Sequence, residues 1–155
     1  MSVLRSCVEE IAKVERRCYP AGLVRYTKSE LLLQYGIVMP FNATSFKGRR
    51  MKAHACYQNA GKLALYEGYT YCEGYILQFG AIPIEHAWVL DRNGKVLDRT
   101  VRNKESIGEY YGITFSREYL IKVLTRSKVW GILDPMYNRP LFNGTDNPED
   151  MLFKR

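Results

Sequence analysis

The chain has 155 residues, of which 46% are hydrophobic and 25% charged, and its formal net charge is +7. This is ordinary globular composition for about one domain spanning 1–155, long enough to bury a real core. No apolar run approaches the roughly 20 residues that a membrane-spanning helix needs, and acidic residues stand where a signal peptide needs an apolar stretch. We therefore expect a soluble, cytoplasmic protein without a membrane partner.

The positive charge favours an anionic partner through long-range steering. The basic residues are scattered, however, and the densest cluster is residues 47–52. A solvated loop and helix start accounts for this cluster better than a nucleic-acid patch does, so a nucleic-acid partner is open but not favoured. The same charges bear on any thiol that follows them, because nearby positive charge lowers the pKa of a cysteine.

Four cysteines are present, at positions 7, 18, 56 and 72. None forms a CxxC pair, so a zinc ribbon is not expected and we assign no metal ligands. In a reducing cytoplasm all four are free thiols. Three of them are interpreted as small buried hydrophobic residues, and Cys56 is the one with chemically useful neighbours.

The N-terminal half is predicted to be mainly helical. Apolar residues at three- and four-residue spacing predict an amphipathic helix over 3–18. Thr27 and Glu30 form a capping-box pattern that starts a short second helix. Residues 37–50 are expected to form a loop, and residues 51–67 a central helix that carries Cys56.

The second half is predicted to be an antiparallel sheet. Residues 69–79 favour a strand that is interrupted at 73–74, and residues 84–101 favour a hairpin around the turn signal Asn93-Gly94. Ser116 caps a later helix, and the remainder is mostly loop. The prediction is one α+β domain with N-terminal helices packed on an antiparallel sheet and a catalytic core at about 50–125.

A thiol, an imidazole and a carboxylate follow one another in the order Cys56, His86, Asp98. A thiol attacks acyl carbon as the thiolate, so it needs a base or the positive end of a helix. His86 shares a strand face with Ile84 and Trp88, and we expect that face to pack on the cysteine helix.

Asp98 is the less secure member of this group. If Asn93-Gly94 forms a two-residue loop, Arg92 pairs with Lys95, and Asp98 then lies opposite Val89. This register puts Asp98 within roughly 5–8 Å of His86 but on the opposite strand face. Taken singly, each of the three residues is better explained as core or turn, whereas their joint occurrence favours a catalytic function.

Four segments of the chain carry a family resemblance: 56–60 (CYQNA), 73–75 (EGY), 86–88 (HAW) and 97–98 (LD). They resemble the transglutaminase-like branch of papain-like proteins, which includes arylamine N-acetyltransferases and peptide N-glycanases. Small uncharacterised proteins of bacteria and phages with an EGY…HAW pattern are similar too.

The resemblance implies a papain-like core in which Cys56 is the nucleophile, His86 the base and acid, and Asp98 the orienting group. The chain departs from the papain pattern at position 50, where Arg50 replaces the upstream glutamine that stabilises the oxyanion. The backbone N–H of Cys56 is one substitute donor, and the side chains of Gln58 and Asn59 are others.

Two further residues are candidates for substrate contact. Glu73 could select a cationic or amine group, or it could be an exposed strand carboxylate. Trp88 could line the cleft or fill the core. The aromatic segment 110–115 has the same two interpretations, a pocket wall or core packing, of which core packing is slightly favoured.

The predicted function is thiol-dependent acyl chemistry on a protein or a small amide or thioester, by hydrolysis, deamidation or acyl transfer, without a cofactor. One alternative is a catalytically silent papain-like protein whose basic surface binds an acidic protein or nucleic acid. A plain nucleic-acid-binding module is a third, and its affinity should fall steeply with salt.

Overall fold

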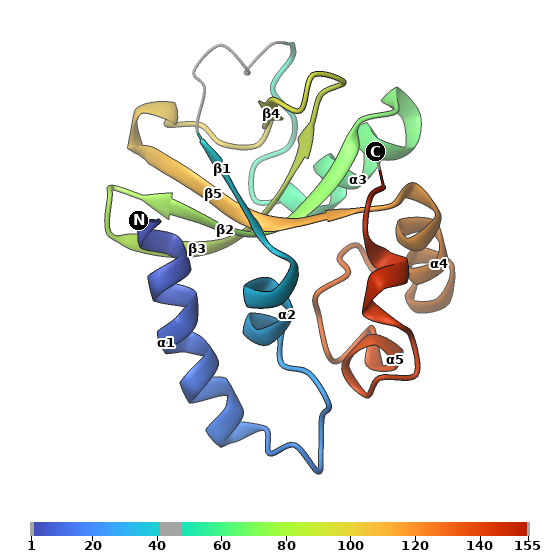
Figure 1. The fold of residues 1–155 in the computed structure, drawn as a ribbon. Coiled ribbons are helices and arrows are strands. Elements are labelled where there is room, and N and C mark those ends of the chain that lie inside the picture. Colours follow the sequence, from blue (N-terminus) through green and yellow to red (C-terminus); the bar gives the residue numbers. More distant parts are fainter. Residues whose placement is uncertain (1, 41–47, 155) are drawn as a thin grey trace.

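The structure is a computed structural model that describes residues 2–40 and 48–154. It is an α+β fold with a five-stranded antiparallel sheet in the order β1-β5-β2-β3-β4, shown in Figure 1. The strands are β1 (Ile37–Pro40), β2 (Thr70–Gln78), β3 (Ile82–Leu90), β4 (Val96–Leu97) and β5 (Ile107–Phe115). The α-helices are α1 (Val3–Cys18), α2 (Lys28–Tyr35), α3 (Cys56–Glu67), α4 (Arg117–Ser127) and α5 (Arg139–Phe142). Two 3₁₀ helices, η2 (Lys104–Ser106) and η3 (Pro148–Met151), complete the described part of the chain.

The predicted α+β class with an antiparallel sheet is confirmed, but the predicted order, with the N-terminal helices before the whole sheet, is broken by β1, which precedes α3 in the chain. Helix α1 has the predicted bounds, and its residues Leu4, Val8 and Ala12 are buried along one stripe. Both halves of the capping box at Thr27 and Glu30 form, and they begin α2. Within the described residues, no helix combines the length and apolar character needed to span a lipid bilayer.

The sheet carries a hydrophobic core on each face. The larger core packs α1, α2, α3 and α4 against one face, which includes Tyr71, Ala87, Val89 and Ile113. In Figure 1, α1 and α2 lie below the sheet beside β1 and β5, and α4 and α5 lie below its other end. The smaller core lies on the opposite face and contains Cys72, Trp88 and Tyr110. The sheet is therefore buried on both sides at its centre.

The predicted interruption of the first long strand is wrong, because β2 runs unbroken from Thr70 to Gln78. Gly74 lies directly opposite Gly112 of β5. A Cβ at Gly74 would stand 2.1 Å from the Tyr111 carbonyl oxygen, and one at Gly112 would stand 2.6 Å from the Trp88 ring. These glycines permit a close approach of two strands and a ring, and they do not break the strand.

The predicted loop over 37–50 is wrong for residues 37–40, which form β1 and pair with β5. The part over 41–47, including residue 47 of the basic cluster, lies outside the described residues. The aromatic segment 110–115 belongs to β5, where Tyr110 and Tyr111 are fully buried. Core packing, the slightly favoured interpretation of that segment, is therefore confirmed.

The hairpin forms, but its register differs by one residue from the predicted one. Val89 pairs with Leu97, so Asp98 comes opposite Trp88 and not opposite Val89. The reason is Asp91, whose carboxylate accepts hydrogen bonds from the N–H groups of Asn93 and Lys95 at 2.8 and 2.9 Å and enlarges the turn. A shift of one residue exchanges the two faces of a strand, so Asp98 comes onto the face of His86.

Replacing Gly112 by alanine tests the close approach of β2, β3 and β5. We expect Gly112→Ala to lower the free energy of unfolding by about 1–3 kcal/mol, because the new methyl group meets the Glu73 carbonyl and the Trp88 ring. Gly108→Ala in the same strand is the matched control, since its Cβ comes no closer than 3.6 Å to other atoms. Urea unfolding measures both, and equal stability of the two variants would contradict the packing described.

Candidate active site

Cys56 is the first residue of α3, so the helix that was predicted over 51–67 begins five residues later in the structure. Residues 51–55 form an irregular approach in which His54 has a left-handed backbone, with φ of 58°. The N-cap is Ala55, whose side chain offers no acceptor to the first N–H groups of the helix. The half-buried thiol therefore stands at the positive end of a twelve-residue helix.

The thiol reaches the sheet at the open edge of β3. Its sulfur accepts hydrogen bonds from the N–H groups of Ala87 and Tyr57, and it also hydrogen-bonds the His86 ring. Along β3, the N–H groups of every second residue point to the same side of the strand. On the side that faces β4, the N–H of Asp91, just after the strand, donates to the Lys95 carbonyl across the turn. The N–H of Ala87 points to this same side, beyond the two positions at which β4 pairs with β3.

His86 and Asp98 are in direct contact. His86 Nε2 lies 2.6 Å from Asp98 Oδ2, and both side chains are buried. Asp98 accepts three more hydrogen bonds: from the Tyr110 hydroxyl at 3.1 Å and from the N–H groups of Thr100 and Val101 at 2.8 and 3.1 Å. Because Nε2 is held by Asp98, Nδ1 is the ring nitrogen that remains for the thiol.

The electrostatics favour a charged pair of thiolate and imidazolium. Burial raises the pKa of Cys56, but the hydrogen bond and positive charge of His86 outweigh it, so the pKa of this thiol lies below its ordinary value. Burial lowers the pKa of His86, but Asp98 and Cys56 raise it by more than burial lowers it, so the pKa of His86 is about 9. The pKa of Asp98 is lowered against the effect of burial, mainly by His86. An ionised Asp98 can only accept, so His86 Nε2 is the donor.

The expectation that the His86 face packs on the cysteine helix is wrong. The α3 residues Ala60, Leu63 and Ala64 share a core with Ala87, on the other face of β3. His86 instead lies on the face of Trp88, with the two rings stacked at 6.3 Å. Thiol and imidazole therefore meet around the edge of the strand.

Trp88 fills the core and does not line a cleft. Its side chain is 1% exposed, and its indole N–H donates to the sulfur of Met39 at 3.3 Å. Its ring also packs edge-on against Tyr110 at 4.9 Å. Trp88 and Tyr110 thus enclose the imidazole of His86 on its buried side.

Asn59 is a positioning residue and not an oxyanion donor, which corrects its predicted role. Its buried amide donates to the Lys52 carbonyl at 2.7 Å and to the Thr100 hydroxyl at 2.9 Å. It thereby ties the second turn of α3 to the chain before Cys56 and to the segment that holds Asp98. The half-buried side chain of Gln58 makes no hydrogen bond to another residue within 2–40 and 48–154.

Glu73 is buried, so its interpretation as an exposed strand carboxylate is wrong. Its carboxylate accepts hydrogen bonds from the Tyr71 hydroxyl at 2.7 Å and from the N–H groups of Ile132 and Leu133. Burial raises its pKa. Glu73 therefore anchors the C-terminal segment to the sheet.

The other cysteines stay apart from this group. All are free thiols, as predicted; Cys72 is buried, Cys7 is half-buried and Cys18 is exposed. The expectation of burial is therefore confirmed for Cys72 and wrong for Cys18. No cysteine other than Cys56 hydrogen-bonds a histidine in the described part of the chain.

Sequence reasoning missed several contributors to the site: the Thr100 and Tyr110 hydroxyls and the backbone N–H groups of Tyr57, Ala87, Thr100 and Val101. A backbone group has no sequence signal, and the tyrosine was considered only as core or pocket wall. Comparisons of the chain with protein-family models, curated proteins and solved structures gave no match. The function must therefore be argued from the geometry of the site.

Replacing Asp98 by asparagine tests the origin of the His86 charge. We expect the pKa of His86 to fall well below about 9, because a neutral amide no longer stabilises the imidazolium. The amide oxygen can still accept from Thr100 and Val101, so the segment keeps its shape. NMR titration in a His54→Gln background, which leaves a single histidine, measures the change. An unaltered His86 titration would contradict the assigned contact.

Proposed function

We propose that the protein is a cysteine-dependent enzyme of acyl chemistry, with a papain-like, transglutaminase-like catalytic core. In this proposal Cys56 is the nucleophile, His86 the acid and base, and Asp98 the orienting residue. The observation that carries the proposal is a single imidazole that hydrogen-bonds a buried carboxylate at 2.6 Å and also hydrogen-bonds a helix-terminal thiol. This is the arrangement that nucleophile activation by a dyad and a third group requires.

The first half-reaction forms an acyl-enzyme. The Cys56 thiolate adds to the substrate carbonyl carbon, and the carbonyl π electrons move to oxygen. When the tetrahedral intermediate collapses, the bond to the leaving nitrogen or sulfur breaks. The His86 imidazolium gives its Nδ1 proton to that leaving group, and neutral His86 and a thioester on Cys56 remain.

The second half-reaction releases the acyl group. Neutral His86 accepts a proton from water or from an amine as that nucleophile adds to the thioester carbonyl. Collapse breaks the carbon–sulfur bond and regenerates thiolate and imidazolium. Water yields hydrolysis or deamidation, and an amine yields transfer. The three side chains and the substrate supply every proton and electron pair in these steps.

The start of α3 is the proposed site for the oxyanion. The N–H groups of the first helical turn point toward developing negative charge, and Ala55 provides no side-chain acceptor for them. We assign the backbone N–H of Cys56 as one donor and the side-chain amide of Gln58 as the second. This pair replaces the glutamine that the papain pattern has at position 50.

Alkylation by iodoacetamide tests the nucleophile. At pH 6 we expect Cys56 to react at least ~10-fold faster than Cys18, because ordinary thiols are almost wholly protonated there, whereas the His86 charge preserves a Cys56 thiolate. The rate should fall at lower pH as the thiolate is protonated. The charge on His86 should be lost only as the pH rises through about 9. Peptide mapping by mass spectrometry resolves the four cysteines.

Cys18 is the matched comparison, since it is exposed and thus more accessible than Cys56. His86→Gln should reduce the ratio of the two rates to about one or below. Asp98→Asn gives a second, milder test if the first variant folds poorly, and it should lie between wild type and His86→Gln. A folded wild-type protein whose Cys56 reacts no faster than Cys18 would overturn the proposed function.

A further inference from the structure

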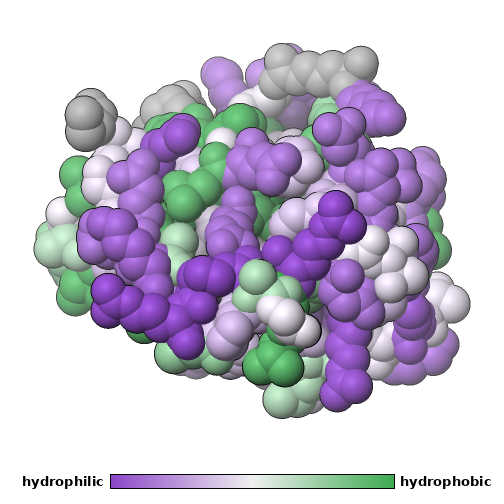
Figure 2. All heavy atoms as spheres, turned by 60° about the horizontal axis from the view of Figure 1, so that its bottom comes forward, coloured by the Kyte–Doolittle hydropathy of each residue, from purple (hydrophilic) through white to green (hydrophobic). Residues whose placement is uncertain are grey.

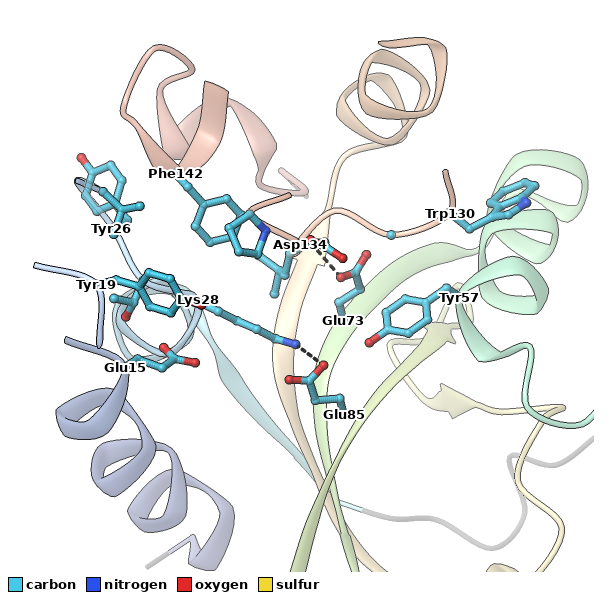
Figure 3. Close-up of a pocket in the computed structure, with 15 residues that line it drawn as sticks. Glu15, Tyr19, Tyr26, Lys28, Tyr57, Glu73, Glu85, Trp130, Asp134 and Phe142 are labelled. Atoms are coloured by element: carbon cyan, nitrogen blue, oxygen red, sulfur yellow. Dashed lines mark hydrogen bonds and ion pairs between the residues drawn. The ribbon is translucent and has the colours of Figure 1, made fainter. Parts of the chain in front are cut away.

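A cavity of about 400 Å³ lies on the helix-covered face of the sheet beside the candidate active site. Figure 3 shows it between α1 and α2 on one side and α3 on the other, under the C-terminal segment that contains Asp134. Figure 2 shows the underside of the molecule, where hydrophobic residues are exposed between hydrophilic ones. The cavity is large enough for a substrate side chain.

The lining of this cavity is acidic, although the chain as a whole carries a net charge of +7. Among the described lining residues, Lys28 is the one basic side chain, and its ammonium group binds Glu85 at 2.9 Å. Four carboxylic acids line the cavity together with that single ammonium group. They are Glu15, Glu73, Glu85 and Asp134.

Two of these carboxylates are committed to the fold to different degrees. Glu73 is buried and occupied by three donors, so it shapes the floor and sets its polarity. Glu85, by contrast, keeps 56% of its side chain exposed, and among the described residues its contacts are Lys28 and a weak 3.4 Å bond from Tyr75. Glu85 is therefore the carboxylate most able to exchange its partner for a ligand.

Aromatic side chains form the walls. In Figure 3, Tyr57 and Trp130 stand on one side of the cavity, and Tyr26 and Phe142 stand on the other. The hydroxyl of Tyr57 points toward Glu85 in the same view. Aromatic faces attract cations, so the walls and the carboxylates select the same kind of ligand.

The cavity opens within reach of the thiol. Tyr57 lines it and follows Cys56 directly in the chain. Glu85 stands on β3 two residues before Ala87, whose N–H holds the Cys56 sulfur, and two residues of a strand span about 6.6 Å. A lysine or arginine side chain on the residue at the reacting carbonyl can cover this distance.

We propose that this cavity binds the ammonium or guanidinium group of a lysine or arginine side chain in the acyl substrate. This inference rests on the proposed function. The bound cation is not the attacking amine. An amine attacks as the free base, and a site rich in carboxylates stabilises its protonated form. The cavity therefore selects the acyl donor and holds its side chain while the carbonyl meets Cys56.

Two chloromethyl ketones that differ in the terminal ammonium group of the side chain test this inference. We use acetyl-lysine and acetyl-norleucine chloromethyl ketone and measure the second-order rate of Cys56 alkylation by mass spectrometry. In wild type we expect the lysine reagent to alkylate Cys56 at least ~10-fold faster than the norleucine reagent does, since a charge-assisted contact replaces an apolar one. Glu85→Gln and Glu15→Gln should each reduce this preference several-fold.

Glu10→Gln is the matched control, because Glu10 lies on α1 like Glu15 but is exposed and outside the cavity lining. It should retain the wild-type preference. Each rate is divided by the iodoacetamide rate of Cys56 in the same variant, which separates thiol reactivity from recognition. Equal lysine and norleucine rates on a reactive Cys56, or equal losses in Glu10→Gln and Glu85→Gln, would overturn the inference alone. An unreactive Cys56 would overturn the proposed function.

Discussion

The buried carboxylate of Asp98 is the contact on which the site depends. A charge at this depth is costly unless it is hydrogen-bonded, and Asp98 accepts from four donors. These donors come from β3, from β5 and from the chain just after β4. Thr100 extends the network to Asn59 on α3, one turn beyond Cys56. The contacts therefore form a closed ring from the thiol through the imidazole and the carboxylate back to the same helix.

Local patterns predicted most of the elements. Helical spacing and capping residues are sufficient for α1, α2 and α4, because those signals act within a few residues. The register of the hairpin was not predictable from the Asn93-Gly94 signal, since the Asp91 side chain determines how the turn closes. That one-residue difference decides whether Asp98 faces His86. The chain order of Cys56, His86 and Asp98 thus indicated three residues that meet in the structure, while the contact of Asp98 with His86 required the turn geometry.

Long-range roles were the least accessible from sequence. Glu73 was predicted either to select a substrate group or to be an exposed strand carboxylate, and Asn59 was predicted as a candidate oxyanion donor. Their actual partners are about 60 and 41 residues away, at Ile132, Leu133 and Thr100. A single sequence carries no signal for such pairs. In both cases a buried polar group satisfies its hydrogen bonds by joining segments that are distant in the chain.

The thiol of Cys56 also completes the sheet. At Ala87 the edge of β3 lacks the carbonyl that a longer β4 would provide, and the sulfur serves as the acceptor in its place. An alanine at position 56 removes both the proposed nucleophile and this acceptor, and an unsatisfied buried N–H costs about 1–3 kcal/mol. A serine keeps an oxygen acceptor there. A variant that lacks the proposed nucleophile but keeps the sheet edge intact is therefore better made with serine than with alanine.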